Sequence, residues 1–146
     1  MFSTFGFLYL GCWQYYLFVH IMPRLFPGAE AFAGSSLRAK LADAQGQRAV
    51  AAQVAIENFG NNCLLYFPCF YTVQTLYEGG QAGDGLRKFR ANFAEDAPAI
   101  LALWVPVQTL NFSLSPLWMR VPVTTMASAF WTTYVSFSRG ATRVEV

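Results

Sequence analysis

The chain has 146 residues, of which 55% are hydrophobic and only 12% are charged. A water-soluble domain of this size must cover a large surface, and about 25% of its residues are typically charged. The composition therefore excludes an ordinary soluble domain and predicts a membrane protein. The formal net charge of +2 favours neither nucleic acid nor an acidic substrate as a partner.

Residue types that build catalytic or metal sites are scarce. His20 is the only histidine, and Cys12, Cys63 and Cys69 form no CxxC pair. This spacing predicts small buried apolar side chains rather than a zinc site or a disulfide framework. No nucleophile–base–acid set and no glycine-rich phosphate loop before a helix is visible in the sequence. We therefore expect no enzyme activity, no metal and no cofactor.

Apolar runs along the chain predict an all-α fold, an integral membrane helical bundle of three to four transmembrane helices with proline-kinked spans. Residues 1–146 form a single membrane domain in this prediction. The first span covers about 2–22, because about 20 apolar residues cross a hydrocarbon core of about 30 Å. Pro23, Pro27 and Gly28 then end it.

Residues 23–48 are predicted as a surface loop rich in Ala, Ser and Gln. Leu37 and Leu41, four residues apart, favour a short amphipathic helix on the membrane surface. A solvated connector is an equally good interpretation of this segment.

The second predicted span covers about 49–77 and contains Glu57 and Pro68. A glycine-rich and charge-rich loop follows at 78–96, and the third span covers about 97–114. An intramembrane carboxylate costs several kcal/mol unless it is paired or hydrated. Glu57 is therefore either a functional group of the membrane interior or a group near the membrane surface, or it is protonated and hydrogen-bonded.

The fourth predicted span, about 121–137, has a small polar side chain at every fourth position. Helices in lipid associate through close approach at small residues and through interhelical hydrogen bonds. We expect this helix-packing stripe to face other helices, and a pore lining is the alternative. The stripe consists of Thr124, Ser128, Thr132 and Ser136.

Two amides stand in the apolar third span, close to a proline. Pro106 frees a backbone carbonyl, and Gln108 and Asn111, three residues apart, lie on nearly one face. We expect Pro106 to kink the helix and the amides to point inward, toward freed backbone groups, Arg120 and the Glu57–Asn58 pair. Amides that face lipid would each lose hydrogen bonds worth several kcal/mol. Arg120 is expected to reach the interface with its head or to pair with an acid.

The last third of the chain resembles the peroxisomal membrane protein 22 kDa family, of the Mpv-seventeen / PMP-twenty-two type. The family signature is Trp-x-Pro-x-Gln, then Asn-Phe, a proline, an arginine, and Trp with Tyr-x-Ser. The matching residues, which we take as family motif and internal polar core, are Trp104, Pro106, Gln108, Asn111, Phe112, Pro116, Arg120, Trp131, Tyr134 and Ser136.

Upstream the resemblance is looser. Glu57 and Asn58 stand where the family has an Asp-Gln pair, each replaced by its closest chemical relative. Family members usually have a further hydrophobic segment before the block that opens this chain. The chain is therefore identified as a divergent and N-terminally short member.

The resemblance implies a non-enzymatic integral protein of an organelle membrane, similar to small-solute channels. The mitochondrial inner membrane is the first expected location, and peroxisomal and plastid membranes are alternatives. The alternative function is a structural accessory subunit of a larger membrane protein complex. The expected partners are membrane lipids and, under this alternative, other membrane subunits; no nucleic acid is expected.

Overall fold

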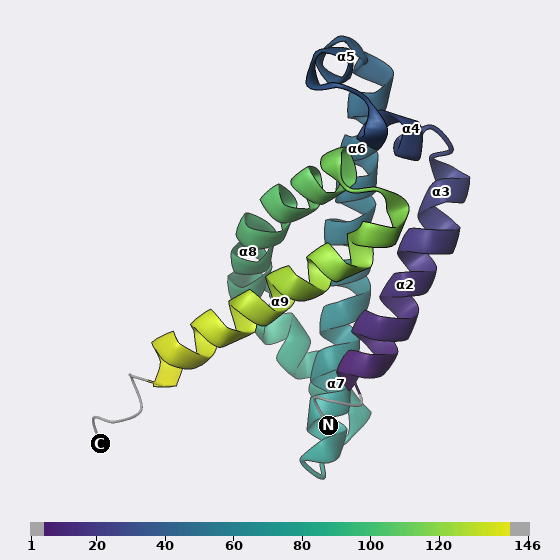
Figure 1. The fold of residues 1–146 in the computed structure, drawn as a ribbon. Helices are drawn as coiled ribbons and strands as arrows, with labels where there is room; N and C mark the ends of the chain where they lie inside the picture. The colour runs from purple at the N-terminus through teal and green to yellow at the C-terminus, as the bar shows by residue number, and fades with distance from the viewer. Residues whose placement is uncertain (1–4, 141–146) are drawn as a thin grey trace.

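The computed structural model describes the backbone of residues 5–140 and the side chains of residues 5–130. All regular structure in this part of the chain is helical (Figure 1), so the predicted all-α class is confirmed. Long helical rods pack side by side, joined at one end by short helices and at the other by a tight turn.

The first rod runs without a break over residues 6–25 and alternates between π- and α-helix. It corresponds to the first predicted span. The rod ends where Phe26 leaves helical geometry, with φ of −131° and ψ of 70°. Its segments are η1 (Gly6–Trp13), α2 (Gln14–Tyr16), η2 (Leu17–Ile21) and α3 (Met22–Leu25).

Two short helices, α4 (Ala29–Gly34) and α5 (Leu37–Ala42), follow at one end of the bundle (Figure 1). Ser36 begins α5, because its hydroxyl accepts a hydrogen bond from the Ala39 N–H at 3.3 Å. The short helix predicted around the two leucines is thus present. Leu37 and Leu41 project outward and are 71% and 72% exposed.

The second rod is also unbroken and covers residues 44–77. It starts before the predicted boundary of 49, because the Asp43 carboxylate accepts a hydrogen bond from the Gly46 N–H at 2.9 Å and caps the first turn. Its segments are α6 (Ala44–Ala55), η3 (Ile56–Tyr66) and α7 (Phe67–Tyr77).

The predicted loop over 78–96 is much shorter in the structure, where helix α8 (Ala82–Leu114) begins directly after Gln81. Gln81 and Asp84 form a capping box in which each side chain pairs with the other residue's backbone N–H. The charge-rich stretch beyond it consists mainly of good helix formers, so the cap is enough to start the helix early. Gly79, with φ of +84°, makes the turn.

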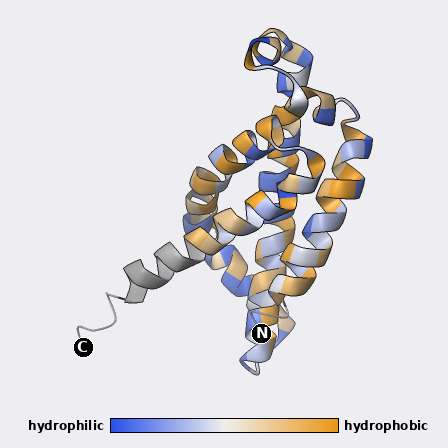
Figure 2. Ribbon diagram, in the orientation of Figure 1, coloured by the Kyte–Doolittle hydropathy of each residue, from blue (hydrophilic) through white to orange (hydrophobic). Residues whose placement is uncertain are grey.

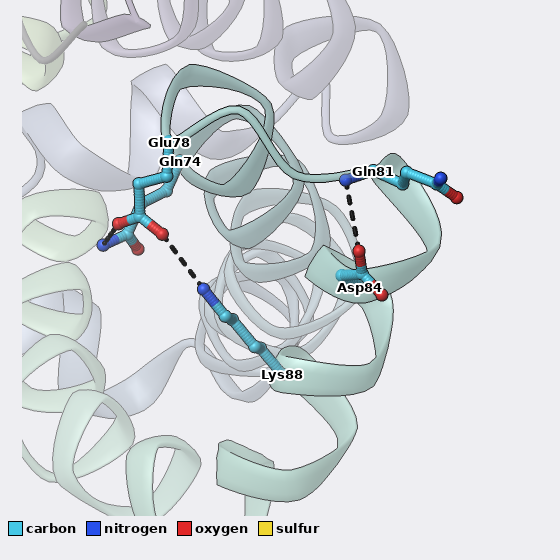
Figure 3. A network of polar contacts seen from close by, with 5 residues as sticks. All are labelled: Gln74, Glu78, Gln81, Asp84 and Lys88. Carbon is cyan, nitrogen blue, oxygen red and sulfur yellow. Dashed lines mark hydrogen bonds and ion pairs between the residues drawn. The ribbon is translucent and has the colours of Figure 1, made fainter.

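Polar contacts hold this turn together (Figure 3). Gln74 donates to Glu78 at 3.2 Å, and the ammonium of Lys88 lies 3.0 Å from the second Glu78 oxygen. The Gln81 N–H donates to the Asp84 carboxylate at 3.2 Å. Both members of the Lys88–Glu78 pair are about half exposed, so the pair contributes little stability by itself.

Helix α8 keeps its helical backbone through Pro98 and Pro106. It is drawn as a bent helix in Figure 1. Ser115 and Pro116 form the next turn, and helix α9 (Leu117–Gly140) crosses the bundle obliquely. Within the described residues, α8 is the one helix that is long and apolar enough, by length and composition, to cross a membrane.

The bundle combines an apolar cluster with an apolar exterior. At the cluster, Phe18 from the first rod stacks edge-on against Phe112 of α8, and both are fully buried. On the outside, Trp118, Met126 and Phe130 of α9 are 73% to 80% exposed. Figure 2 shows hydrophobic residues along the outer faces of the rods. The rest of the cluster consists of Leu17, Met22, Phe32, Val50 and Val54.

Candidate functional site

The interior of the bundle is unusually polar. A soluble core of this size buries few amides and almost no unpaired charges, whereas this chain buries an acid, an arginine and several amides at its centre. These groups come from every long helix, so the polar interior holds the whole bundle together. The buried polar residues are Gln14, Lys40, Gln53, Glu57, Asn58, Asn61, Thr75, Gln108, Asn111, Ser115, Arg120 and Thr124.

One polar cluster, which we call the Glu57 cluster, joins the first two rods. Oε1 of Glu57 accepts hydrogen bonds from Gln14 Nε2 at 2.8 Å and from Asn61 Nδ2 at 3.1 Å. Oδ1 of Asn61 in turn accepts from the Tyr9 hydroxyl at 2.7 Å and from the Trp13 indole at 2.8 Å. Glu57 is fully buried, and its Oε2 has no hydrogen-bond partner.

Sequence reasoning singled out Glu57 but missed Gln14, Gln53 and Asn61. A signal was available, since Gln53, Glu57 and Asn61 are spaced by four residues and therefore share one helix face. In the structure this face points inward. Three polar groups on one stripe of an apolar span indicate an internal network, just as the packing stripe of the fourth span does.

A second polar cluster, the Asn111 cluster, joins α8, the following turn and α9. Nδ2 of Asn111 donates to the Arg120 carbonyl at 3.0 Å, to Thr124 Oγ1 at 3.1 Å and to Gln108 Oε1 at 3.2 Å. Gln108 and Asn111 are almost completely buried. Both amides therefore point into the bundle. They meet Arg120 and Thr124, whereas Glu57 and Asn58 bond elsewhere.

Arg120 lies differently from what the sequence suggests. Its side chain is fully buried, and it reaches neither the interface nor an acid within ion-pair distance among the described residues. Nη1 instead donates to Gln53 Oε1 at 3.1 Å, and Nε donates to the Ser115 carbonyl at 3.4 Å. The guanidinium also lies 5.2 Å from the centre of the Phe112 ring. The tight turn before α9 directs the Arg120 side chain toward the second rod. Its partner there is the amide of Gln53 rather than the expected acid.

A cavity of about 140 Å³ separates the two clusters. The Glu57 cluster contributes Glu57 and Gln14 to its wall, and the Asn111 cluster contributes Gln108 and Thr124. Ser128 of α9 extends this polar wall. A space of this size and polarity can hold several water molecules or one small solute. The remaining wall is Leu10, Asn62, Tyr66, Ile100 and Trp104.

The remaining residues of the predicted polar core lie around this cavity or pack beside it. Asn58 is fully buried and donates to the Val54 carbonyl at 2.9 Å. Trp104 is half-buried at the cavity wall, whereas Pro106 is exposed on the outer face of α8. Pro116 lies half-buried in the turn before α9.

Of the predicted packing stripe, the structure describes the side chains of Thr124 and Ser128. Thr124 is buried and donates to the Arg120 carbonyl at 2.8 Å, and Ser128 is half-buried at the cavity. The other predicted residues of α9 lie outside the residues whose side chains are described; these are Trp131, Thr132, Tyr134 and Ser136.

Groups that could hold a metal ion are not clustered in the described part of the chain, where no three His, Cys, Asp or Glu side chains lie together. The cavity wall carries one carboxylate with amides, hydroxyls and aromatic rings. Such a wall can bind a solute by hydrogen bonds.

Curated relatives match about half of the chain. Protein SYM1 of Mycosarcoma maydis is 33% identical over 72 residues, which are 49% of this chain and 36% of the relative. Protein SYM1 of Eremothecium gossypii and protein sym1 of Aspergillus oryzae are 34% and 35% identical over 71 residues, 49% of this chain and 39% of each relative. The match thus spans well under half the length of these relatives. No solved structure matches the chain.

The model of the Mpv17 / PMP22 family matches residues 75–136, which include the Trp-x-Pro-x-Gln motif and the residues that form the Asn111 cluster. The family resemblance of the sequence is thereby confirmed. Over residues 75–136, the chain is similar to the Mpv17 / PMP22 family.

Proposed function

We propose that this chain is a non-enzymatic membrane protein of three to four spans, in which the polar cavity forms part of a path for small solutes. The observation that carries the proposal is the cavity itself, which has Glu57 and Gln108 in its wall, both fully buried. An apolar bundle needs no such groups for packing, and each buried polar group costs free energy unless it is bonded. In a hydrated path, these groups can form hydrogen bonds with water and solutes.

Similarity to the Mpv17 / PMP22 family supports a location in an organelle membrane. We place the chain first in the mitochondrial inner membrane, with peroxisomal and plastid membranes as alternatives. The exposed aromatic and aliphatic side chains of the rods suit contact with lipid acyl chains, for example Phe130 at 80% exposure and Trp118 at 73%.

The lengths of the rods support the proposed number of spans. At about 1.5 Å per residue, residues 6–25 reach about 30 Å, the thickness of a hydrocarbon core. The rod of residues 44–77 and helix α8 are longer. Alkaline carbonate treatment of isolated membranes should leave the protein in the pellet. Release into the supernatant would show that the chain is peripheral and would remove the proposal.

The solute path is tested in vesicles that contain the purified protein. Vesicles loaded with a small uncharged dye should lose it faster than protein-free vesicles. Ser128→Leu, which places a bulky side chain at the cavity, should slow the release, and Thr125→Leu on the exposed side of the same helix should not. Equal release from vesicles with and without the protein would contradict a solute path.

An accessory subunit of a larger complex is the second candidate. It is favoured by the groove between the first rod and α7, whose wall is rich in aromatic rings, among them Trp13 and Tyr77. Mild detergent extracts separated by native electrophoresis distinguish the two functions. An accessory subunit migrates with a large assembly, whereas a channel-like protein migrates as a small homomeric species.

A further inference from the structure

Helix α5 turns its lysine inward and its leucines outward. Lys40 is buried, and its Nζ donates a hydrogen bond at 2.8 Å to the carbonyl of Ala33, near the end of α4. Leu37 and Leu41 lie on the outer side of α5 and are 71% and 72% exposed. A solvated connector would place these side chains the other way round, because apolar surface in water is unfavourable. The orientation of α5 therefore favours an interfacial surrounding for the two leucines.

The depth of α5 relative to a bilayer follows from the two long rods. At one end of the bundle, the ring centre of Phe5 lies 5.7 Å from that of Tyr66 and 5.9 Å from that of Phe70. About 20 residues along each rod, or about 30 Å, lead from this contact to Leu25 and to the first turns of α6. This distance is the thickness of a hydrocarbon core. Helix α5 lies beyond Leu25 at this same end (Figure 1), which is the headgroup level when the rods span a bilayer.

Exposed positive charge gathers at the end of the bundle that carries α5. Arg24 lies in the last turn of the first rod, Arg38 lies in α5, and Arg48 lies near the start of α6; all three are exposed. None of them forms an ion pair within the described part of the chain. The acids at this end are Glu30 and Asp43, and the Asp43 carboxylate already caps α6. The three guanidinium groups are therefore available to an anionic partner.

The balance of charge is different at the opposite end. There Arg87 and Lys88 are each held in an ion pair by an acid of the same chain. Glu95 and Asp96 add two further acids, and Arg90 adds one cation. Among the described residues, cations without an acidic partner are thus concentrated beside α5.

We propose that α5 is an interfacial anchor that binds the anionic surface of a bilayer. Leu37 and Leu41 insert at the boundary between headgroups and acyl chains, and the guanidinium groups of Arg24, Arg38 and Arg48 bind the lipid phosphates. A guanidinium suits this role because its planar N–H groups donate two parallel hydrogen bonds to phosphate oxygens. Leucines beside arginines on a helix at headgroup depth are typical of interfacial helices on anionic membranes. The inference rests on the membrane location in the proposed function and adds the class of lipid.

The class of lipid is tested by titration of the purified full chain in micelles of an uncharged detergent. The probes are short-chain phosphatidylglycerol, short-chain phosphatidylcholine and inorganic phosphate. A bound lipid raises the midpoint of thermal unfolding, and the concentration dependence gives an apparent Kd. We expect phosphatidylglycerol to bind more tightly than phosphatidylcholine, and inorganic phosphate to leave the midpoint unchanged. Equal binding of the two lipids, or an equal effect of inorganic phosphate, would overturn the proposal.

The role of the arginines is tested by Arg38→Gln. An arginine at an anionic membrane surface contributes about fivefold in affinity. The variant should therefore bind phosphatidylglycerol about fivefold more weakly and phosphatidylcholine unchanged. The triple variant Arg24→Gln, Arg38→Gln, Arg48→Gln should lose the preference. Arg87→Gln, at the opposite end, is the matched control and should bind like the wild type. A preference that persists in the triple variant, or an equal loss in the control, would contradict the proposal.

Insertion of the leucine face is tested with a spin label on Leu37→Cys or Leu41→Cys, in a chain whose native cysteines are replaced by alanine. In vesicles that contain phosphatidylglycerol, the label should collide more with oxygen, which dissolves in lipid, than with a water-soluble nickel chelate. Ala39→Cys, two residues from each leucine and so on the opposite side of α5, is the control and should show the reverse.

The alternatives for the leucine face give different results. Collision mainly with nickel at positions 37 and 41 would show that the face lies in water, and protection from both reagents would assign it to a second protein chain. Either result would overturn the proposal. Carbonate extraction separates this inference from the proposed function. A chain that stays in the pellet but shows no lipid preference removes this inference alone, whereas release of the chain removes the proposed function.

Discussion

Nδ2 of Asn111 donates a hydrogen bond to the backbone carbonyl of Arg120 at 3.0 Å, across the turn between α8 and α9. The same nitrogen contacts Gln108 and Thr124, so one amide ties together two turns of α8 and the first turns of α9. The bond fixes where α9 leaves the turn. The same amide also holds the side chain of Gln108, which lines the cavity.

Asn111→Leu should therefore destabilise the bundle more than the change in side-chain size alone would. The substitution keeps the branched shape of the side chain but removes the donor that the oxygens of Gln108 and Thr124 share. An unsatisfied buried group costs about 1–3 kcal/mol, and we expect the free energy of unfolding to fall by that amount. Thermal or denaturant unfolding in detergent measures it. Thr125→Val, which removes an exposed hydroxyl on α9, should change little; equal losses in both variants would contradict the role of Asn111.

Gly85 lies at a close contact between α8 and α7. A Cβ placed there would lie 2.6 Å from the Thr72 Cα and 2.8 Å from the Tyr71 carbonyl oxygen, and neither backbone atom can move aside alone. Gly85→Ala should lower the free energy of unfolding by about 1–3 kcal/mol, the usual cost of overpacking.

Gly83→Ala is the matched control for this contact, because Gly83 lies in the same helical turn and an added Cβ there would meet no atom within 4 Å beyond its chain neighbours and the helix's own backbone. It should stabilise the protein by about 0.5–1 kcal/mol, since alanine is the better helix former. A similar response of the two variants in thermal unfolding would show that α7 and α8 are not in close contact.

Ser128→Leu tests the packing of α9. Ser128 is half-buried at the cavity, where a leucine must push neighbouring helices apart or fill the space. We expect a lower midpoint of thermal unfolding. Thr125→Leu, on the exposed side, should leave the midpoint nearly unchanged, because lipid or detergent accepts an apolar side chain. Equal midpoints for Ser128→Leu and wild type would contradict the inward placement of the stripe.

Asp84 makes the start of α8 sensitive to acid. The Gln81 backbone N–H and the Arg87 guanidinium hold the pKa of Asp84 below its ordinary value of 3.8. Because this pKa is lower in the folded state, the carboxylate stabilises the helix start at every pH above 3.8, and the effect is lost as the pH falls through the lowered pKa. Helix content by circular dichroism should therefore decline in this acid range. Asp84→Asn should flatten the decline; an unchanged decline would assign it to other groups.

The all-helical class and the polar interior were predictable from the sequence, because both follow from the free-energy cost of unpaired polar groups in an apolar span. The start of α8 was not, since glycines and charges around residue 84 favour a loop until the Gln81–Asp84 cap is recognised. The partner of Arg120 was not predictable either. Gln53 lies far away in the sequence, and only packing of the second rod against α9 brings the two side chains together.

A solute path requires that water and small solutes reach the cavity, and the accessibility of a cysteine placed there measures whether they do. In a background of Cys12→Ala, Cys63→Ala and Cys69→Ala, the chain with Ser128→Cys is placed in vesicles and treated with a small, uncharged, water-soluble thiol reagent, which reacts with thiolates and therefore not with a thiol held in lipid.

Met126, which is 73% exposed on the outer face of α9, becomes a lipid-facing control as Met126→Cys. Gly83→Cys, at the exposed start of α8, is an aqueous control that must react. We predict that Ser128→Cys reacts and that Met126→Cys does not. Reaction at Gly83→Cys without reaction at Ser128→Cys would show that the cavity is sealed, and would contradict a solute path through this protein.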